Sequence, residues 1–126
     1  ISCASSMTLK ENFLGVDGED VLERMRRIPV NSWNYTDEGR QSRHMGPFAE
    51  DFWREFGLGS EPLAIGHLDI DGVNFAGIKA LDARTEGHAD RIQALEAAVA
   101  ERDARIQALE TRLLRLEALV PAAPTP

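Results

Sequence analysis

The chain has a single cysteine among its 126 residues, so no disulfide within one chain can support the fold. It also lacks any run of about 18 apolar residues, the length that a membrane-spanning helix needs. Basic residues are fewer than acidic ones, 14 against 21, and the net charge is -7. Nucleic acids and anionic membranes bind surfaces with surplus positive charge, so the composition argues against both as partners.

The first residues also lack the charged and apolar regions of a signal peptide, and we expect Ile1 to continue from an upstream polypeptide. The composition then changes near Asp71: glycine, proline and aromatic residues are mixed before it, and no proline follows before Val120. This change predicts an α+β fold, with a small mixed head of short strands and helices followed by a long C-terminal helix. The expected parts are an upstream end or cleavage linker at 1–4, the head at 5–71, the helix at 72–120 with its strongest coiled-coil pattern at 90–120, and a disordered tail at 121–126.

Within the head, turn residues separate short periodic segments. We expect an extended piece at LKENFLGV, a helix at DGEDVLERMRRI, a strand at VNSWNY, a turn at TDEGR, a helix at HMGPFAEDFWREFGLG and a last strand at LAIGHLDI. Pro47 should open the second helix, Gly57 should close it, and Asp71 should cap the long C-terminal helix. The aromatic residues expected in the core are Trp33, Tyr35, Phe48, Phe52 and Phe56.

The C-terminal helix contains a heptad pattern, because RIQALE occurs at 91–96 and again at 105–110, and RLLRLE follows at 112–117. The a positions hold Ile92, Val99, Ile106, Leu113 and Val120, and the d positions hold Leu95, Arg102, Leu109 and Leu116. Arginine recurs at g and glutamate at e, where parallel chains can pair them. Between Leu81 and Ile92 the apolar stripe fails, since Thr85 and His88 occupy a and d.

The pattern predicts a parallel coiled coil, since the head is too short to cover a helix of about 45 Å. β-Branched residues at a with leucine at d favour a dimer. The repeated Arg, apolar, two free positions, apolar, Glu order instead resembles a pattern associated with trimers, and we expect a homotrimer. Its interface should contain Ile92, Leu95, Val99, Ile106, Leu109, Leu113 and Leu116.

The segment SSMTLK places Ser5 five residues before Lys10. A serine hydroxyl attacks a carbonyl only when a base takes its proton, and a lysine serves once desolvation or nearby positive charge favours its neutral form. Serine with lysine is a known alternative to the catalytic triad. Spacing alone leaves two readings open: a nucleophile with its base, or a linker serine and a surface lysine.

The chain as a whole resembles the intramolecular chaperone domain of phage tailspikes and tail fibres, the endosialidase type of self-cleaving peptidase. The resemblance rests on SSMTLKENF, VLERMRRIPVNSWNY, RHMGPFAEDFWREFGLG and LDIDGVNFAGIKAL, in this order before a terminal coiled coil. It covers nearly all of residues 5–120. It implies a domain that trimerises, assists the folding of an upstream fibre or spike of the same polypeptide, and belongs to a virion or phage-derived tail-fibre particle.

The resemblance also implies autoproteolysis between Ala4 and Ser5, with Ser5 as the nucleophile and Lys10 as its base. Many members follow this serine with aspartate, whereas this chain has Ser6, which is also an alternative nucleophile. The other function that remains open is a permanent trimeric cap or adaptor that never cuts. No cofactor is implied.

Other candidate sites have weaker patterns. His44, His67 and His88 show no metal-ligand spacing with one another or with Cys3, so no metal site is expected. We expect His44 to serve the fold, and Cys3 is a further candidate nucleophile.

The heptad pattern makes a direct prediction. Replacing Ile106 or Leu109 with Asp should dissociate the trimer, because it buries an unpaired charge in the packed seam and costs several kcal/mol. Arg105→Glu should weaken the trimer less, by placing like charges near Glu110 of a neighbouring helix. Sedimentation at micromolar concentration measures both effects, and a monomeric parent chain would contradict the assignment.

Overall fold

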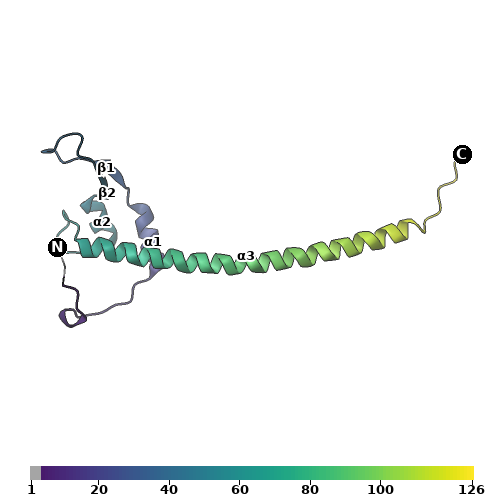
Figure 1. Cartoon of the computed structure of the whole chain (residues 1–126), viewed down its shortest axis with the longest axis horizontal. Coiled ribbons are helices and arrows are strands. Elements are labelled where there is room, and N and C mark those ends of the chain that lie inside the picture. Colours follow the sequence, from purple (N-terminus) through teal and green to yellow (C-terminus); the bar gives the residue numbers. More distant parts are fainter. Residues whose placement is uncertain (1–3) are drawn as a thin grey trace. The chain divides into compact units, whose positions relative to one another are not determined.

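The computed structural model describes residues 4–126 and confirms the α+β class (Figure 1). A small head of short helices and a two-stranded sheet precedes one long helix. The elements are η1 (Met7–Leu9), α1 (Gly18–Arg27), β1 (Asn31–Trp33), β2 (His44–Gly46), α2 (Ala49–Phe56) and α3 (His67–Glu117). The chain divides into two compact units, the first ending at Ala83 and the second beginning at Arg84. No helix among the described residues is both long and apolar enough to cross a membrane.

Helix α1 begins and ends where the sequence predicts. The side chain of Asp17 accepts a hydrogen bond from the Glu19 backbone N–H at 2.9 Å, which caps the first turn. At the other end Ile28 is already extended, as expected for a residue that precedes proline. Val21 and Leu22 are buried on the predicted apolar face.

Strands β1 and β2 form an antiparallel pair in which Ser32 lies opposite Met45. Strand β1 confirms the expected strand, and the turn segment lies between the two strands. Strand β2 was not expected, because its residues were assigned to the start of the following helix. Pro47 explains the difference, since the residues before a proline favour extended backbone and Gly46 therefore stays in a strand.

Helix α2 is shorter than expected at its start and ends as expected. Its N-cap is Phe48, and Gly57 ends it in the left-handed conformation with φ 61°. Glycine adopts this conformation without the steric cost of a Cβ. Phe52 in the middle of α2 is only 3% exposed.

The strand expected just before the long helix is wrong. The segment LAIGHLDI forms no strand, because α3 begins at His67 rather than after Asp71. The Gly66 carbonyl accepts hydrogen bonds from the backbone N–H groups of Asp69 and Ile70, both at 3.1 Å, and so starts the helix. In the segment LKENFLGV, where an extended piece was expected, Leu9 ends the short 3-10 turn η1 and Lys10 has extended backbone.

The core is small and centres on Val21, Phe52 and Val73, which come from α1, α2 and α3. The expectation that all five aromatic residues lie in this core is wrong. Phe48 is 46% exposed and Tyr35 is 55% exposed. Trp33 is half-buried in the hairpin, where its ring contacts those of Tyr35 and His44 at centroid distances of 4.8 Å.

A charged network joins α1 to α2. Arg27 Nε donates to Glu55 Oε2 at 2.8 Å, and Arg24 Nη1 donates to the Glu55 carbonyl at 2.6 Å. The hydrogen bond from Arg27, followed by a weaker one from Arg54, lowers the pKa of the Glu55 carboxyl. The same bond to Glu55 raises the pKa of Arg27. These residues hold the two helices together at the edge of the core.

Helices α1 and α3 approach closely at Gly18, where an added Cβ would lie 2.8 Å from the Cβ of Ala80. Alanine forms helix better than glycine, so propensity alone would make Gly18→Ala stabilising. We expect it instead to lower the free energy of unfolding by about 1–3 kcal/mol, the usual cost of overpacking. Thermal or urea unfolding measures the change.

Two further variants separate this contact from general effects. Gly15→Ala is the matched control, because an added Cβ at Gly15 meets no atom within 4 Å. The double variant Gly18→Ala with Ala80→Gly removes the opposing methyl group and should recover part of the loss. Strictly additive effects of the two substitutions would show that the contact does not limit stability.

Candidate functional site

The Ser5 to Lys10 segment is built around the turn η1, which Ser6 caps. Ser6 Oγ accepts a hydrogen bond from the Thr8 backbone N–H at 3.3 Å and lies 2.8 Å from Thr8 Oγ1. The Ser6 carbonyl accepts from the Leu9 N–H at 3.1 Å. Serine and aspartate both favour this capping position. The cap could have been predicted from Ser6, a favoured capping residue, but the sequence analysis did not predict it.

The turn brings together the two residues that the sequence singled out. Lys10 follows η1 in extended conformation, with its backbone N–H bonded to the Met7 carbonyl at 3.1 Å. Its Nζ donates to Ser5 Oγ at 2.6 Å. The 3-10 turn between them therefore explains how the side chains of Ser5 and Lys10, five residues apart, come into contact. Ser6, the alternative nucleophile, faces Thr8 through its hydroxyl.

The pair lies on the surface of a single chain, and apolar residues occur close to it in the sequence. Ser5 and Lys10 are both exposed. Met7, Leu9 and Phe13 are also exposed, at 66% or more. Clusters of large exposed apolar side chains usually mark surfaces that another molecule covers.

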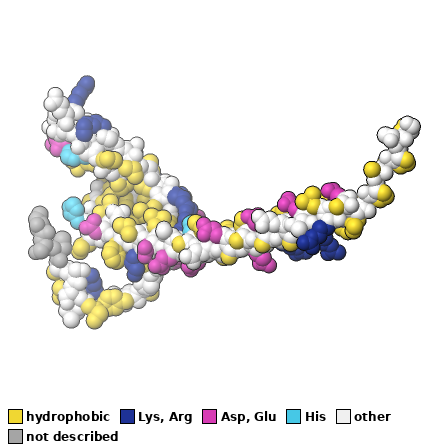
Figure 2. All heavy atoms as spheres, turned by 45° about the vertical axis from the view of Figure 1, so that its right-hand side comes forward, with side chains coloured by type: hydrophobic (Ala, Val, Ile, Leu, Met, Phe, Trp, Pro, Cys, Tyr) yellow, Lys and Arg dark blue, Asp and Glu magenta, His cyan; other side chains and the backbone are white. Residues whose placement is uncertain are grey.

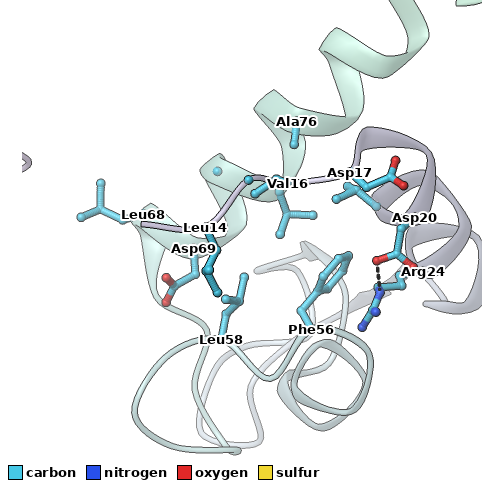
Figure 3. Close-up of a pocket in the computed structure, with 14 residues that line it drawn as sticks. Leu14, Val16, Asp17, Asp20, Arg24, Phe56, Leu58, Leu68, Asp69 and Ala76 are labelled. Carbon is cyan, nitrogen blue, oxygen red and sulfur yellow. Dashed lines mark hydrogen bonds and ion pairs between the residues drawn. The ribbon is translucent and has the colours of Figure 1, made fainter. Parts of the chain in front are cut away.

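The chain next runs along a groove in the head (Figure 3). Leu14 and Val16 from this segment, Asp20 of α1 and Ala76 of α3 contribute to its lining, together with Phe56 at the end of α2. The dashed line in Figure 3 is the hydrogen bond from Arg24 to Asp20, 2.8 Å long. The groove is mainly apolar with carboxylates at its edge, and it was not predicted from the sequence.

The remaining candidates do not converge on a second site within one chain. His44 stacks on Trp33 with ring centroids 4.8 Å apart, and its Nε2 lies 2.9 Å from Glu38 Oε2. It thus forms part of the hairpin, in agreement with the expected role in the fold. Within residues 4–126 of one chain, no three His, Cys, Asp or Glu side chains are placed to hold a metal ion. Cys3 lies outside the described residues.

The predicted interface residues lie on one face of α3. All seven are between 51% and 56% exposed, as expected for side chains in a row along a single helix without a partner. They are Ile92, Leu95, Val99, Ile106, Leu109, Leu113 and Leu116. Figure 2 shows hydrophobic side chains alternating with charged ones along this helix.

Comparison with protein families identifies the head. Residues 5–57 match the Peptidase_S74 family, which is described as the chaperone of endosialidase. No curated protein matches the chain. The match starts at Ser5 and ends at Gly57, the residue that terminates α2. This segment, with the Ser5–Lys10 pair at its start, is therefore similar to the chaperone of endosialidase family.

Proposed function

We propose that the chain is an intramolecular chaperone that trimerises, assists the folding of an upstream fibre or spike, and then releases itself by cutting between Ala4 and Ser5. The observation that carries the cleavage part is the contact of 2.6 Å between Lys10 Nζ and Ser5 Oγ. The family of the head supports the chaperone part. Together they favour a protein that acts only on its own chain.

In the proposed reaction, Ser5 Oγ attacks the carbonyl carbon of Ala4 while the neutral Lys10 amine takes the hydroxyl proton. The C–N bond then breaks, the proton passes to the Ser5 amino group, and Ala4 is left as an ester on Ser5 Oγ. Water hydrolyses this ester and frees a carboxylate at Ala4 and the hydroxyl of Ser5. Nucleophile and carbonyl are adjacent in one chain, so proximity replaces a substrate pocket.

Assembly provides the environment that this chemistry needs. A lysine acts as a base only in its neutral form, and removal from water favours that form. In one chain the pair is exposed, but its neighbours Met7, Leu9 and Phe13 are apolar and would be covered in an assembly. We infer that the trimer buries this segment and thereby starts cleavage.

The trimer itself rests on the apolar face of α3. Its a and d side chains are half exposed in one chain. Burying them would stabilise the assembly by about 25 cal/mol per Å² of apolar surface. A parallel homotrimer covers them and also brings Arg105 and Glu110 of adjacent helices within reach. The partners are therefore two further copies and the upstream segment of the same polypeptide.

The cleavage proposal predicts the behaviour of a precursor extended upstream of Ile1. It should split between Ala4 and Ser5 after folding and without added protease, and Ser5→Ala should abolish the cut while leaving the trimer intact. Lys10→Arg should also fail, because a guanidinium keeps its proton and cannot act as a base. Intact mass measured over time follows all of these.

Two results would change the conclusion. Cleavage of the Ser5→Ala precursor at the parental rate would exclude the Ser5–Lys10 pair and direct attention to Ser6 or Cys3. A parent trimer that stays whole for days at neutral and alkaline pH would favour the alternative function, a permanent cap or adaptor at the end of a fibre.

The Ser6 cap can be tested separately. Ser6→Ala removes the hydroxyl that accepts the Thr8 N–H and should slow cleavage by about five- to thirtyfold, the equivalent of the 1–2 kcal/mol typical of a lost cap. Ser6→Asp preserves the capping acceptor and should cleave at least as fast as the parent chain. Equal rates for Ser6→Ala and the parent would show that the turn does not depend on this cap. Single-turnover rates from intact mass provide the comparison.

A further inference from the structure

His88 is an unpaired histidine in the second compact unit. It is exposed on α3, and among residues 4–126 the structure gives its imidazole no hydrogen-bond or ion-pair partner. Helix α3 continues through this point without a break, so the heptad frame set by Ile92 applies. In that frame His88 is at d, Thr85 precedes it at a, and Ile92 follows it at a.

The proposed trimer gives this position a specific geometry. Side chains at d point toward the neighbouring helices, so three copies of His88 converge on the threefold axis. Packed helices lie 8–10 Å apart, which places each helix about 5–6 Å from that axis. Three imidazole rings reach the axis from this distance. The histidine of each chain would then be in one layer with those of the other two.

A buried layer of three imidazoles is unfavourable unless hydrogen bonds or a metal ion satisfy their nitrogen atoms. Burial of a polar group without a hydrogen bond costs free energy, and the Ile92 side chains on one side of the layer offer the three imidazoles no hydrogen-bond partner. Three neutral imidazoles are, however, the donor set of an open zinc site, with water as the fourth ligand. Binding a metal would offset the cost of the layer.

We propose that the three copies of His88 form a site for a divalent transition metal, with zinc as the best fit; this rests on the proposed trimer. The Ile92 layer lies about 6 Å further along the helix and closes one side with apolar groups. The Thr85 layer lies about 4.5 Å away on the other side and is polar, which suits a bound water. Ala89, beside His88, carries no group that competes for the metal.

Metal binding to the purified full chain tests the site. Native mass spectrometry with added zinc should show one ion per three chains, and cobalt as a probe should give the visible absorption of tetrahedral coordination. His88→Leu keeps an apolar d residue, so it should still form a trimer and lose the ion. A chelator should lower the unfolding temperature of the parent and leave that of His88→Leu unchanged.

The control is His44→Gln. His44 and Glu38 could bind zinc elsewhere in the chain, and this variant should keep one ion per trimer. If His88→Leu does not assemble, His88→Asn provides the second metal-free variant. A trimer that binds no zinc at micromolar concentration, or that binds it equally well after His88 is replaced, overturns the site and leaves the proposed function standing. A chain that stays monomeric contradicts both.

Discussion

The first part of α3 packs against the head on one face and leaves another face exposed. The position of its small residues determines which face packs. Val73, Gly77 and Ala80 are buried. An added Cβ at Gly77 would lie 2.9 Å from Met25 Sδ, so α1 touches the α3 backbone. Ile78, one position further, is 64% exposed on a different face. The head thus becomes compact while Ile78 stays exposed, and the proposed trimer could use that face.

The sequence was sufficient for the local features that single residues determine. The first helix, the glycine that ends α2 and the long C-terminal helix were predicted and confirmed, whereas the predicted cap at Asp71 lies inside α3. Strand β2 and the start of α3 were not predicted. Strand β2 depends on pairing with β1, which periodicity in a segment of three residues cannot indicate. The start of α3 depends on local hydrogen bonds to the Gly66 carbonyl, which apolar periodicity does not indicate either.

The candidate site shows a similar division. Its two residues, Ser5 and Lys10, came from spacing and a family resemblance, and the structure places their side chains in contact. The role of Ser6 was less apparent, because a replaced aspartate was read as a departure rather than as an equivalent cap. The apolar groove beside α1 could not be predicted, since it is formed by four segments that come together only in the fold.

The turn η1 is held entirely by bonds between residues at most three positions apart, and the Lys10 to Ser5 contact spans only five. Contacts of such short range close on a timescale far below that of the whole fold. The contact between Lys10 and Ser5 can therefore form early, before the rest of the fold is complete. If the protein cuts itself, the contact between Ser5 and Lys10 forms too early to decide when cleavage happens. The moment of cleavage must then depend on when water is excluded from the pair. The moment of cleavage would then be set by the last surface that covers Ser5 and Lys10.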